Sequence, residues 1–420
     1  MIKYFGKKIL TITLVLVTLS TFGQDFKELK GVVLDSDSKN PIGSAIVSLM
    51  QTNTSTVSNS EGDFTLKIDN NSSNGTLLIS YPGYTNQRMP VTKFLEGTLE
   101  IYLQKKITQL DPIAVSSFKD AKNLVRMVFE NKAKNHLDKS VLMTAFYRET
   151  IKRRRTNVSL TEAVVNLHKK PYLSNSRDDV ELQVARKKTN YKKLDTLAFK
   201  LQGGPFSTLY LDIMKYPEYL FANDLIDDYE FSFSEPSTVN NRPVYVIDFK
   251  ELPYIESLRY NGKLYIDAES LALTRAVYSL NLENSKQAER FFTKKKPRDV
   301  IVIPTETSYN VDYREKDGKW YYGYARLDLS FKVNKRRQLF NQNYTVSSEM
   351  AITDWEIQDE DKKIKFRERI KPSIILADRI SGFTDPNFWG EYNLIEPEKS
   401  IESAIEKIRK QIEKEEKRKS

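Results

Sequence analysis

The stretch from Gly31 to Leu103 constrains the fold of this 420-residue chain more than any other. It consists of short segments in which apolar and polar residues alternate, as in Ala45–Leu49 and Phe64–Ile68, and turn residues such as Ser60–Gly62 separate the segments. A period of two places every second side chain on the same face of a strand. Several short strands with turn signals between them predict an antiparallel β-sandwich, and we expect seven strands over residues 29–103.

This stretch resembles the carboxypeptidase regulatory-like domain of the transthyretin-like β-sandwich group. The positions that match the family pattern follow one another in the family order: Gly31, Val33, Asp35, Pro41, Ile42, Ala45, Val47, Leu49, Ser58, Asn59, Gly62, Phe64, Ser80, Tyr81, Gly83 and Tyr84. In the family these positions are core and turn residues of a non-catalytic module, which occurs in many envelope proteins of Bacteroidetes-like bacteria. The resemblance therefore implies an envelope protein whose specific function lies in the domain that follows.

Residues 1–23 have the pattern of a secretory signal peptide. Lys3, Lys7 and Lys8 precede an apolar run over 9–19, and small residues before Gln24 mark a cleavage site. The apolar run is shorter than the ~20 residues that a membrane-spanning helix needs. We therefore expect an exported protein in the periplasm or on the periplasmic face of the outer membrane, peripheral to the membrane at most.

The composition argues against several kinds of site. The chain has no Cys, so disulfides, thiolate ligands and Cys nucleophiles are excluded. Its two histidines, His136 and His168, belong to no zinc-peptidase motif and no Ser-His-Asp pattern. A net charge of +10 without a nucleic-acid motif indicates a solvated basic surface. We predict no metal, no cofactor, no catalytic residue and no nucleic-acid partner.

The rest of the chain predicts a second, larger domain of the α+β class, so that the whole chain is mainly β. We expect a linker over 104–116, an antiparallel-sheet domain over 117–396 and a C-terminal helix over 397–420. Alternation predicts strands near 141–151, 158–168, 179–188, 228–234, 243–250, 261–267, 271–282, 300–313, 319–334 and 341–355. Helical segments are expected near 117–135, 206–222 and 284–293. Near the C-terminus, Phe388 and Trp389 are expected to anchor an irregular segment on the core.

The segment 261–275 predicts a hairpin that turns at Ala268–Ser270. It is similar to the repeating hairpin of the LolA/LolB-like half-barrel proteins, which carry periplasmic lipoproteins. That resemblance implies a curved antiparallel sheet, a half-barrel, with helices over one face. An ordinary flat α+β sheet fits the same strand pattern.

Our first functional hypothesis is a non-enzymatic envelope protein that binds an apolar ligand, a lipoprotein or a protein partner. Candidate ligand-binding side chains are Phe206, Tyr210, Met214 and Tyr216, which form a lid over an apolar cavity or simply fill the core. The second hypothesis is a hydrolase that uses two carboxylates ~5–9 Å apart. Its candidate residues are Glu149, Glu162, Asp212, Asp248 and Asp267. The third hypothesis is a structural accessory module of an outer-membrane complex.

Overall fold

The structure, a computed structural model, describes residues 26–106, 118, 120–154, 156–189, 203–221, 225–253, 258–292, 299–335, 341–358, 368–380, 389–399, 401 and 403. The expected signal peptide over 1–23 lies outside these residues, as do most of the linker over 104–116 and most of the C-terminal helix over 397–420. The proposed domain boundaries therefore stay predictions.

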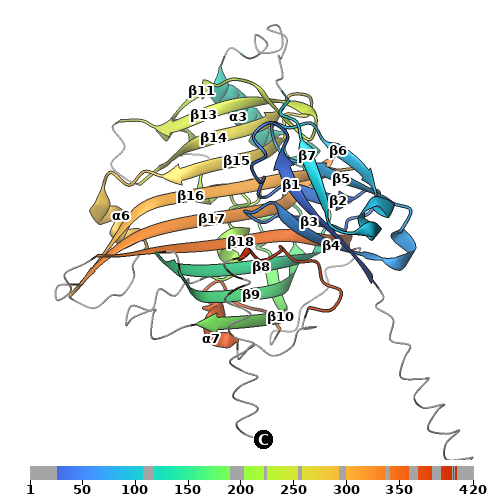
Figure 1. The fold of residues 1–420 in the computed structure, drawn as a ribbon. Helices are drawn as coiled ribbons and strands as arrows, with labels where there is room; N and C mark the ends of the chain where they lie inside the picture. Colours follow the sequence, from blue (N-terminus) through green and yellow to red (C-terminus); the bar gives the residue numbers. More distant parts are fainter. Residues whose placement is uncertain are drawn as a thin grey trace, which may run out of the picture.

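The N-terminal part is the expected seven-stranded sandwich (Figure 1). Strands β1 (Phe26–Asp35), β4 (Asp63–Asp69) and β7 (Leu99–Leu103) form one sheet in the order β4-β1-β7. Strands β2 (Ile46–Leu49), β3 (Ser55–Val57), β5 (Thr76–Ser80) and β6 (Gln87–Pro90) form the other in the order β3-β2-β5-β6. The alternating apolar residues of both sheets, such as Val33, Val47, Phe64 and Ile79, meet in one buried core.

Two positions of the family pattern, Asp35 and Tyr84, fix the first turn of the sandwich. The Asp35 carboxylate accepts hydrogen bonds from the Tyr84 hydroxyl at 2.6 Å and from the backbone N–H groups of Asp37 and Ser38. The Tyr84 hydroxyl is the main cause that lowers the pKa of Asp35. These residues are structural, as the resemblance implied.

The second part is a large antiparallel sheet of eleven strands. Its strands are β8 (Val141–Arg153), β9 (Thr156–Lys169), β10 (Asp179–Thr189), β11 (Tyr229–Phe233), β12 (Ser237–Val239), β13 (Arg242–Glu251), β14 (Tyr260–Asp267), β15 (Leu273–Leu280), β16 (Val300–Lys316), β17 (Lys319–Lys335) and β18 (Gln342–Ile357). Their order is β10-β9-β8-β18-β17-β16-β15-β14-β13-β11, and β12 pairs with β13 off this path. The edge strands β10 and β11 are not paired with each other in the described residues, so the sheet is unclosed. The expected hairpin over 261–275 is the pair β14–β15.

Helices are short and few in the described residues. They are α3 (Ala121–Glu130), α4 (Lys132–Asn135), α5 (Phe206–Leu209), α6 (Ser285–Phe292) and α7 (Leu376–Arg379), with 3-10 turns at Asn70–Ser72, Val91–Glu96, Pro217–Tyr219 and Ile226–Asp228. Helix α3 begins after Asp120, whose side chain accepts a hydrogen bond from the Lys122 N–H at 2.9 Å.

The helical segment expected near 206–222 is helical only in part. Helix α5 ends at Leu209, and turns follow it. Polar side chains compete for the backbone here: the Thr208 hydroxyl donates to the Pro205 carbonyl, and Asp212 accepts from the Lys215 N–H. Pro217 has no N–H to continue a helix.

Different parts of the chain pack on the two faces of the large sheet. On the inner face, side chains such as Tyr322 and Leu327 join α3 and α5 in the main hydrophobic core. On the outer face, Tyr324 packs in a smaller cluster with Val57 of the sandwich and Trp389 near the C-terminus. The sandwich therefore lies on the outer face, opposite α3 (Figure 1).

Residues 389–399, here called the C-terminal strap, lie between the sandwich and the outer face. The Thr56 hydroxyl of β3 donates to the Leu394 carbonyl at 2.7 Å, and Arg148 of β8 donates to the Ile395 carbonyl at 2.6 Å. The buried Trp389 ring packs on Phe146 with a centroid distance of 5.7 Å, which confirms its expected role as an anchor. Phe388 lies outside the described residues.

Candidate functional site

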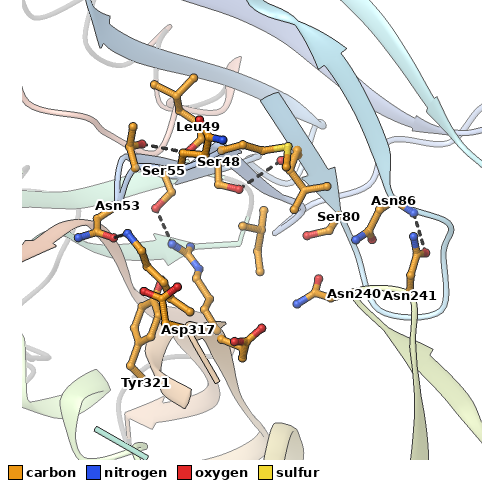
Figure 2. A pocket seen from close by; sticks show the side chains of 18 of the residues that line it. Ser48, Leu49, Asn53, Ser55, Ser80, Asn86, Asn240, Asn241, Asp317 and Tyr321 are labelled. Atoms are coloured by element: carbon orange, nitrogen blue, oxygen red, sulfur yellow. Dashed lines mark hydrogen bonds between the residues drawn. The ribbon is translucent and has the colours of Figure 1, made fainter. Parts of the chain in front are cut away.

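A pocket of about 780 Å³ lies where the sandwich meets the β16–β17 hairpin of the large sheet (Figure 2). The sandwich contributes side chains of β2, the following turn, β5 and β6, and the large sheet contributes residues near 240 and 314–321. Its lining residues are Ile46, Ser48, Leu49, Met50, Gln51, Thr52, Asn53, Ser55, Leu78, Ser80, Asn86, Arg88, Asn240, Asn241, Arg242, Arg314, Glu315, Lys316, Asp317, Trp320 and Tyr321. Hydroxyl, amide and charged side chains predominate, which suits a polar ligand.

Two tight hairpin turns of the large sheet frame the pocket. Asn240 and Asn241, between β12 and β13, both have positive φ, of 51° and 63°. Asp317 and Gly318, between β16 and β17, have φ of 52° and 76°. Positive φ at both central residues defines the type I′ turn, which Asn and Asp-Gly accept readily. Figure 2 shows Asn240, Asn241 and Asp317 on the rim of the same space, opposite Ser48 and Ser80 of the sandwich.

Arg314 lies at the buried end of the pocket. Its Nη1 donates to the Ser55 hydroxyl at 2.5 Å and to the Ile352 carbonyl at 3.0 Å. Its side chain crosses Gly323 of the neighbouring strand, where an added Cβ would lie 2.6 Å from the Arg314 Cγ. A glycine in a strand interior often marks such a close approach. Because Gly323 has no side chain, Arg314 can extend across it and reach Ser55 of the sandwich.

Burial is the main influence on the Arg314 guanidinium, and it lowers the pKa of that group. Nearby Tyr321 and Asp312 act in the opposite direction but do not compensate. The Nε and Nη2 atoms of Arg314 are buried and have no hydrogen-bond partner among the described residues. These two nitrogen atoms are shielded from solvent, and the Tyr321 side chain lies beside the guanidinium.

The other cations of the pocket have partners or face solvent. Arg242 makes a bidentate pair with Asp267, with N···O distances of 2.6 and 2.9 Å. Lys316 donates to the Asn53 side chain and lies 5.6 Å above the Trp355 ring. Arg88 is exposed on β6.

The four ligand-binding candidates from the sequence lie elsewhere, on the inner face. Phe206, Met214 and Tyr216 are buried in the main core, and Tyr210 is partly buried and stacks on Tyr219 at 4.9 Å. The structure brings Tyr210 close to Phe206 and Tyr216, with centroid distances of 5.7 and 5.1 Å. They line neither of the two pockets described here, and their role in ligand binding stays a prediction.

A buried ionic cluster holds this inner segment in place. Lys169 of β9 lies 2.8 Å from an Asp178 oxygen and 2.7 Å from an Asp212 oxygen. The hydroxyls of Tyr216 and Tyr313 donate to Asp178 and Asp212 at 2.7 and 3.0 Å. Burial alone would lower the pKa of Lys169, but the two carboxylates raise it. The cluster is fully bonded and ties residues 206–221 to the sheet.

The five carboxylates of the hydrolase hypothesis occupy separate local structures. Glu162 pairs with Arg148 and Arg186, Asp212 with Lys169, Asp248 with Lys263, and Asp267 with Arg242, whereas Glu149 accepts a hydrogen bond from Tyr147 at 3.0 Å. Neither described pocket is lined by two of them.

Two of these buried carboxylates have pKa values shifted in opposite directions. Burial alone would raise the pKa of Glu162, but the arginines Arg148 and Arg186 lower it. Burial raises the pKa of Glu149 to about 7, against the smaller effect of the Tyr147 hydrogen bond.

A smaller pocket of about 370 Å³ lies over β11, β13 and β14. Its charged residues form exposed pairs across the strands, Glu230 with Lys250 and Asp248 with Lys263. Such pairs are typical of a solvated sheet surface, so we regard the larger pocket as the better candidate.

The histidines make no catalytic arrangement in the described residues. His136 is buried against the Tyr172 ring at 4.7 Å, and burial lowers its pKa to about 3. His168 lies 3.5 Å from Glu181. Within the described ranges no group of three or more His, Cys, Asp or Glu residues could hold a metal ion.

Comparison with known families identifies the sandwich as a domain of known type. Residues 29–115 match the family model of the CarboxypepD_reg-like domain. The match includes every position that carried the resemblance in the sequence. The CarboxypepD_reg-like domain therefore supplies one wall of the pocket, through the outer surface of its β3-β2-β5-β6 sheet.

Two solved structures match at low sequence identity. A DUF1329 family protein from Desulfovibrio piger is 10% identical, and the match covers 57% of this chain and 95% of that one with a TM-score of 0.24. Lipovitellin, from a structure that concerns its lipid–protein interactions, is 7% identical, with coverage of 56% and 27% and a TM-score of 0.25. A search of the curated proteins found no match.

Sequence reasoning missed the pocket residues, although three local signals mark them. These are the Asn240-Asn241 and Asp317-Gly318 dipeptides and Gly323 in the interior of a strand. Each predicts a tight turn or a close approach, but none shows that the three lie around one space.

Proposed function

We propose that this chain is a non-catalytic binding protein of the bacterial envelope, and that its ligand is a small polar molecule. The observation that carries the proposal is the pocket of about 780 Å³ between the CarboxypepD_reg-like domain and the large sheet. Ligand pockets occur preferentially where two units of structure meet, and a few converging polar groups give them specificity. The Ser48, Ser80 and Asn240 side chains converge in this way (Figure 2).

Export is part of the proposal and is supported by the sequence of residues 1–23. No helix in the described part of the chain has the length and hydrophobicity that a membrane crossing needs. We place the protein in the periplasm or on the periplasmic face of the outer membrane.

We propose binding in preference to hydrolysis because the candidate carboxylates serve structural contacts. Four of the five are in ion pairs, and Glu149 is buried with Tyr147 on the inner face. A carboxylate pair for acid–base work needs a shared cleft with room for substrate and water.

The experiment is a thermal-unfolding screen of the full chain with sugars, sugar acids and amino acids, and with palmitate as an apolar probe. Ser48→Trp fills the pocket from β2. Thr76→Trp adds the same bulk to β5 of the same sheet, at a half-buried position outside the pocket lining. A ligand at 100 times its Kd stabilises the folded state by about 2.7 kcal/mol.

We expect at least one polar compound to raise the Tm of the wild type and of Thr76→Trp but not of Ser48→Trp. Equal stabilisation of Ser48→Trp would contradict the proposed site. Stabilisation by palmitate alone, unaffected by Ser48→Trp, would instead favour an apolar site on the inner face near Phe206 and Tyr216.

A further inference from the structure

Arg314 differs from the other buried arginine of the described residues, Arg148. Both side chains are almost fully buried. Arg148 lies 2.8 Å from a Glu162 oxygen and 3.4 Å from Glu349. The guanidinium of Arg314 contacts a hydroxyl, a carbonyl and the Tyr321 side chain but no bonded carboxylate among the described residues, and its Nε and Nη2 atoms lack a well-aligned partner there. A buried cation without a bonded anion is unfavourable and is normally paired.

The two carboxylates beside Arg314 along its own strand, Asp312 and Glu315, have other partners. Asp312 forms a 3.5 Å ion pair with Arg275 and accepts a hydrogen bond from the Asn310 amide at 2.9 Å. The Glu315 carboxylate of the pocket wall accepts the Gly318 N–H at 2.6 Å, which directs it to the hairpin turn. Among the described residues, Arg314 therefore has no bonded carboxylate.

The pocket wall adds further positive charge and hydrogen-bond donors. Four cationic side chains line it, Arg88, Arg242, Arg314 and Lys316, against the two carboxylates Glu315 and Asp317. Among the described residues, the Asn240 amide has no side-chain hydrogen bond, and the buried Asn86 side-chain oxygen has no partner. Amide side chains both donate and accept, as recognition of hydroxyl groups requires.

We propose that the pocket binds its ligand through an oxyanion, a carboxylate or a phosphate, which accepts hydrogen bonds from the Nε and Nη2 atoms of Arg314. Hydroxyl groups of the same small molecule bond the amides of Asn86 and Asn240. This inference rests on the proposed function and specifies its ligand class. Arginine suits the task because its planar donors match the geometry of carboxylate and phosphate oxygens.

Access to the two donors requires one side chain to move, because both nitrogen atoms are buried. Tyr321 lines the pocket beside the guanidinium, and its ring packs on Trp355 at 5.0 Å. Rotation of the Tyr321 side chain opens the end of the pocket, and the ligand's anionic group takes the vacated place.

The test is isothermal titration calorimetry of the full chain at low ionic strength, where charge effects are least screened. The probes are D-glucuronate, D-glucose 6-phosphate, D-glucose and inorganic phosphate. Glucuronate and glucose 6-phosphate distinguish a carboxylate from a phosphate ligand, and glucose tests the need for charge. We expect at least one of the two charged sugars to bind at least about tenfold more tightly than glucose.

Three variants locate the charge effect. Arg314→Gln removes the cation and should weaken binding of the charged sugar at least about tenfold. Asn241→Asp adds a carboxylate and Asp317→Asn removes one, at type I′ turn positions that accept both residue types. The first should weaken and the second strengthen binding of the charged sugar by about two- to fivefold, with no change for glucose. These two exchanges test the proposal even if Arg314→Gln fails to fold.

Unchanged affinity for charged sugars in Arg314→Gln, or in both turn variants, would overturn the inference. So would equal binding of glucose and its charged derivatives, or no binding of either charged sugar at millimolar concentration. If glucose binds and Ser48→Trp abolishes that binding, the proposed pocket stands although the oxyanion inference fails. If Ser48→Trp leaves the binding of every probe unchanged, the ligand does not bind in this pocket, and the proposed function fails as well.

Discussion

Arg148 and Glu162 form a 2.8 Å ion pair across strands β8 and β9, buried beneath the C-terminal strap. The pair belongs to a row of charges on the outer face, because Arg186 also contacts Glu162 and Glu349 contacts both Arg148 and Arg326. This row lies where the sheet, the sandwich and the strap meet, so it fixes the surface on which the pocket is assembled.

Glu162→Gln should destabilise the fold by about 3–5 kcal/mol, because it leaves the buried Arg148 and the adjoining Arg186 without their shared anion. Chemical denaturation measures the loss. The matched control is Asp248→Asn, which breaks a pair with Lys263 whose side chains are 43% and 44% exposed. That change should cost less than about 1 kcal/mol. If Glu162→Gln lowers the free energy of unfolding as little as Asp248→Asn does, the row of charges on the outer face contributes little to stability.

Asn393 should hold the strap on the sandwich. Its side chain accepts the Lys67 N–H at 2.7 Å and donates to the Lys67 carbonyl at 3.0 Å, as a neighbouring strand would. Asn393→Ala removes both bonds and should raise amide exchange across 389–399 while costing about 1–3 kcal/mol. Asn393→Asp keeps the acceptor and should show a smaller effect. Unchanged exchange in Asn393→Ala would contradict this role.

Glu149 should make stability fall as pH rises. Its pKa is raised from 4.5 to about 7 by burial, so between these values the unfolded chain has released the proton and the folded chain has not. The unfolded state then binds fewer protons, and the free energy of unfolding decreases with pH across the window by roughly 3 kcal/mol. Glu149→Gln keeps the neutral form and should remove this decrease. Parallel pH profiles of wild type and variant would contradict the prediction.

His136 should act with the opposite sign. Burial lowers its pKa from 6.5 to about 3, so between these values the unfolded chain binds the extra proton. Stability therefore rises with pH from about 3 to 6.5 through this residue. His136→Phe should flatten that part of the profile in denaturation measured against pH. An unaltered slope below pH 6.5 would show that His136 does not control it.

Gly323→Ala should disturb Arg314 and with it the pocket. The added Cβ would lie 2.6 Å from the Arg314 Cγ, so one side chain must shift. We expect a loss of about 1–3 kcal/mol in unfolding free energy. The double variant Gly323→Ala with Arg314→Ala removes the clash and should recover part of that loss. A double-mutant cycle without coupling would place the strain elsewhere.

Local patterns allowed the sandwich to be predicted. Alternation in segments such as Phe64–Ile68 sets which side chains enter the core, and its turns carry their own residue preferences. Most strands of the large sheet and helix α6 were predictable for the same reason.

Long-range pairing was not predictable from the sequence. Strand β18 leaves the order of the chain and pairs with β8, with Met350 opposite Tyr147. The segment near 206–222 is mostly turns after Leu209 because the Thr208 and Asp212 side chains form hydrogen bonds with the nearby backbone. The spacing of apolar residues does not reveal where polar side chains compete with a helix for backbone hydrogen bonds.

The pocket escaped prediction because distant segments build it. Ser48, Asn240 and Arg314 are far apart in the sequence and meet only when the sandwich docks on the outer face. The turn at Asn240-Asn241 was visible in the sequence, but its neighbours were not.

We propose that a small polar ligand occupies the pocket between the CarboxypepD_reg-like domain and the sheet. The chain has 3 tryptophans, of which Trp320 lines the pocket, Trp355 packs on the pocket residue Tyr321, and Trp389 anchors the strap. Fluorine NMR of the chain labelled with 5-fluorotryptophan therefore gives one signal from each place. On titration with the compound that stabilises the wild type most, we predict that the Trp320 signal shifts in a saturable way while that of Trp389 stays. A stabilising compound that leaves the Trp320 and Trp355 signals unchanged would contradict the account.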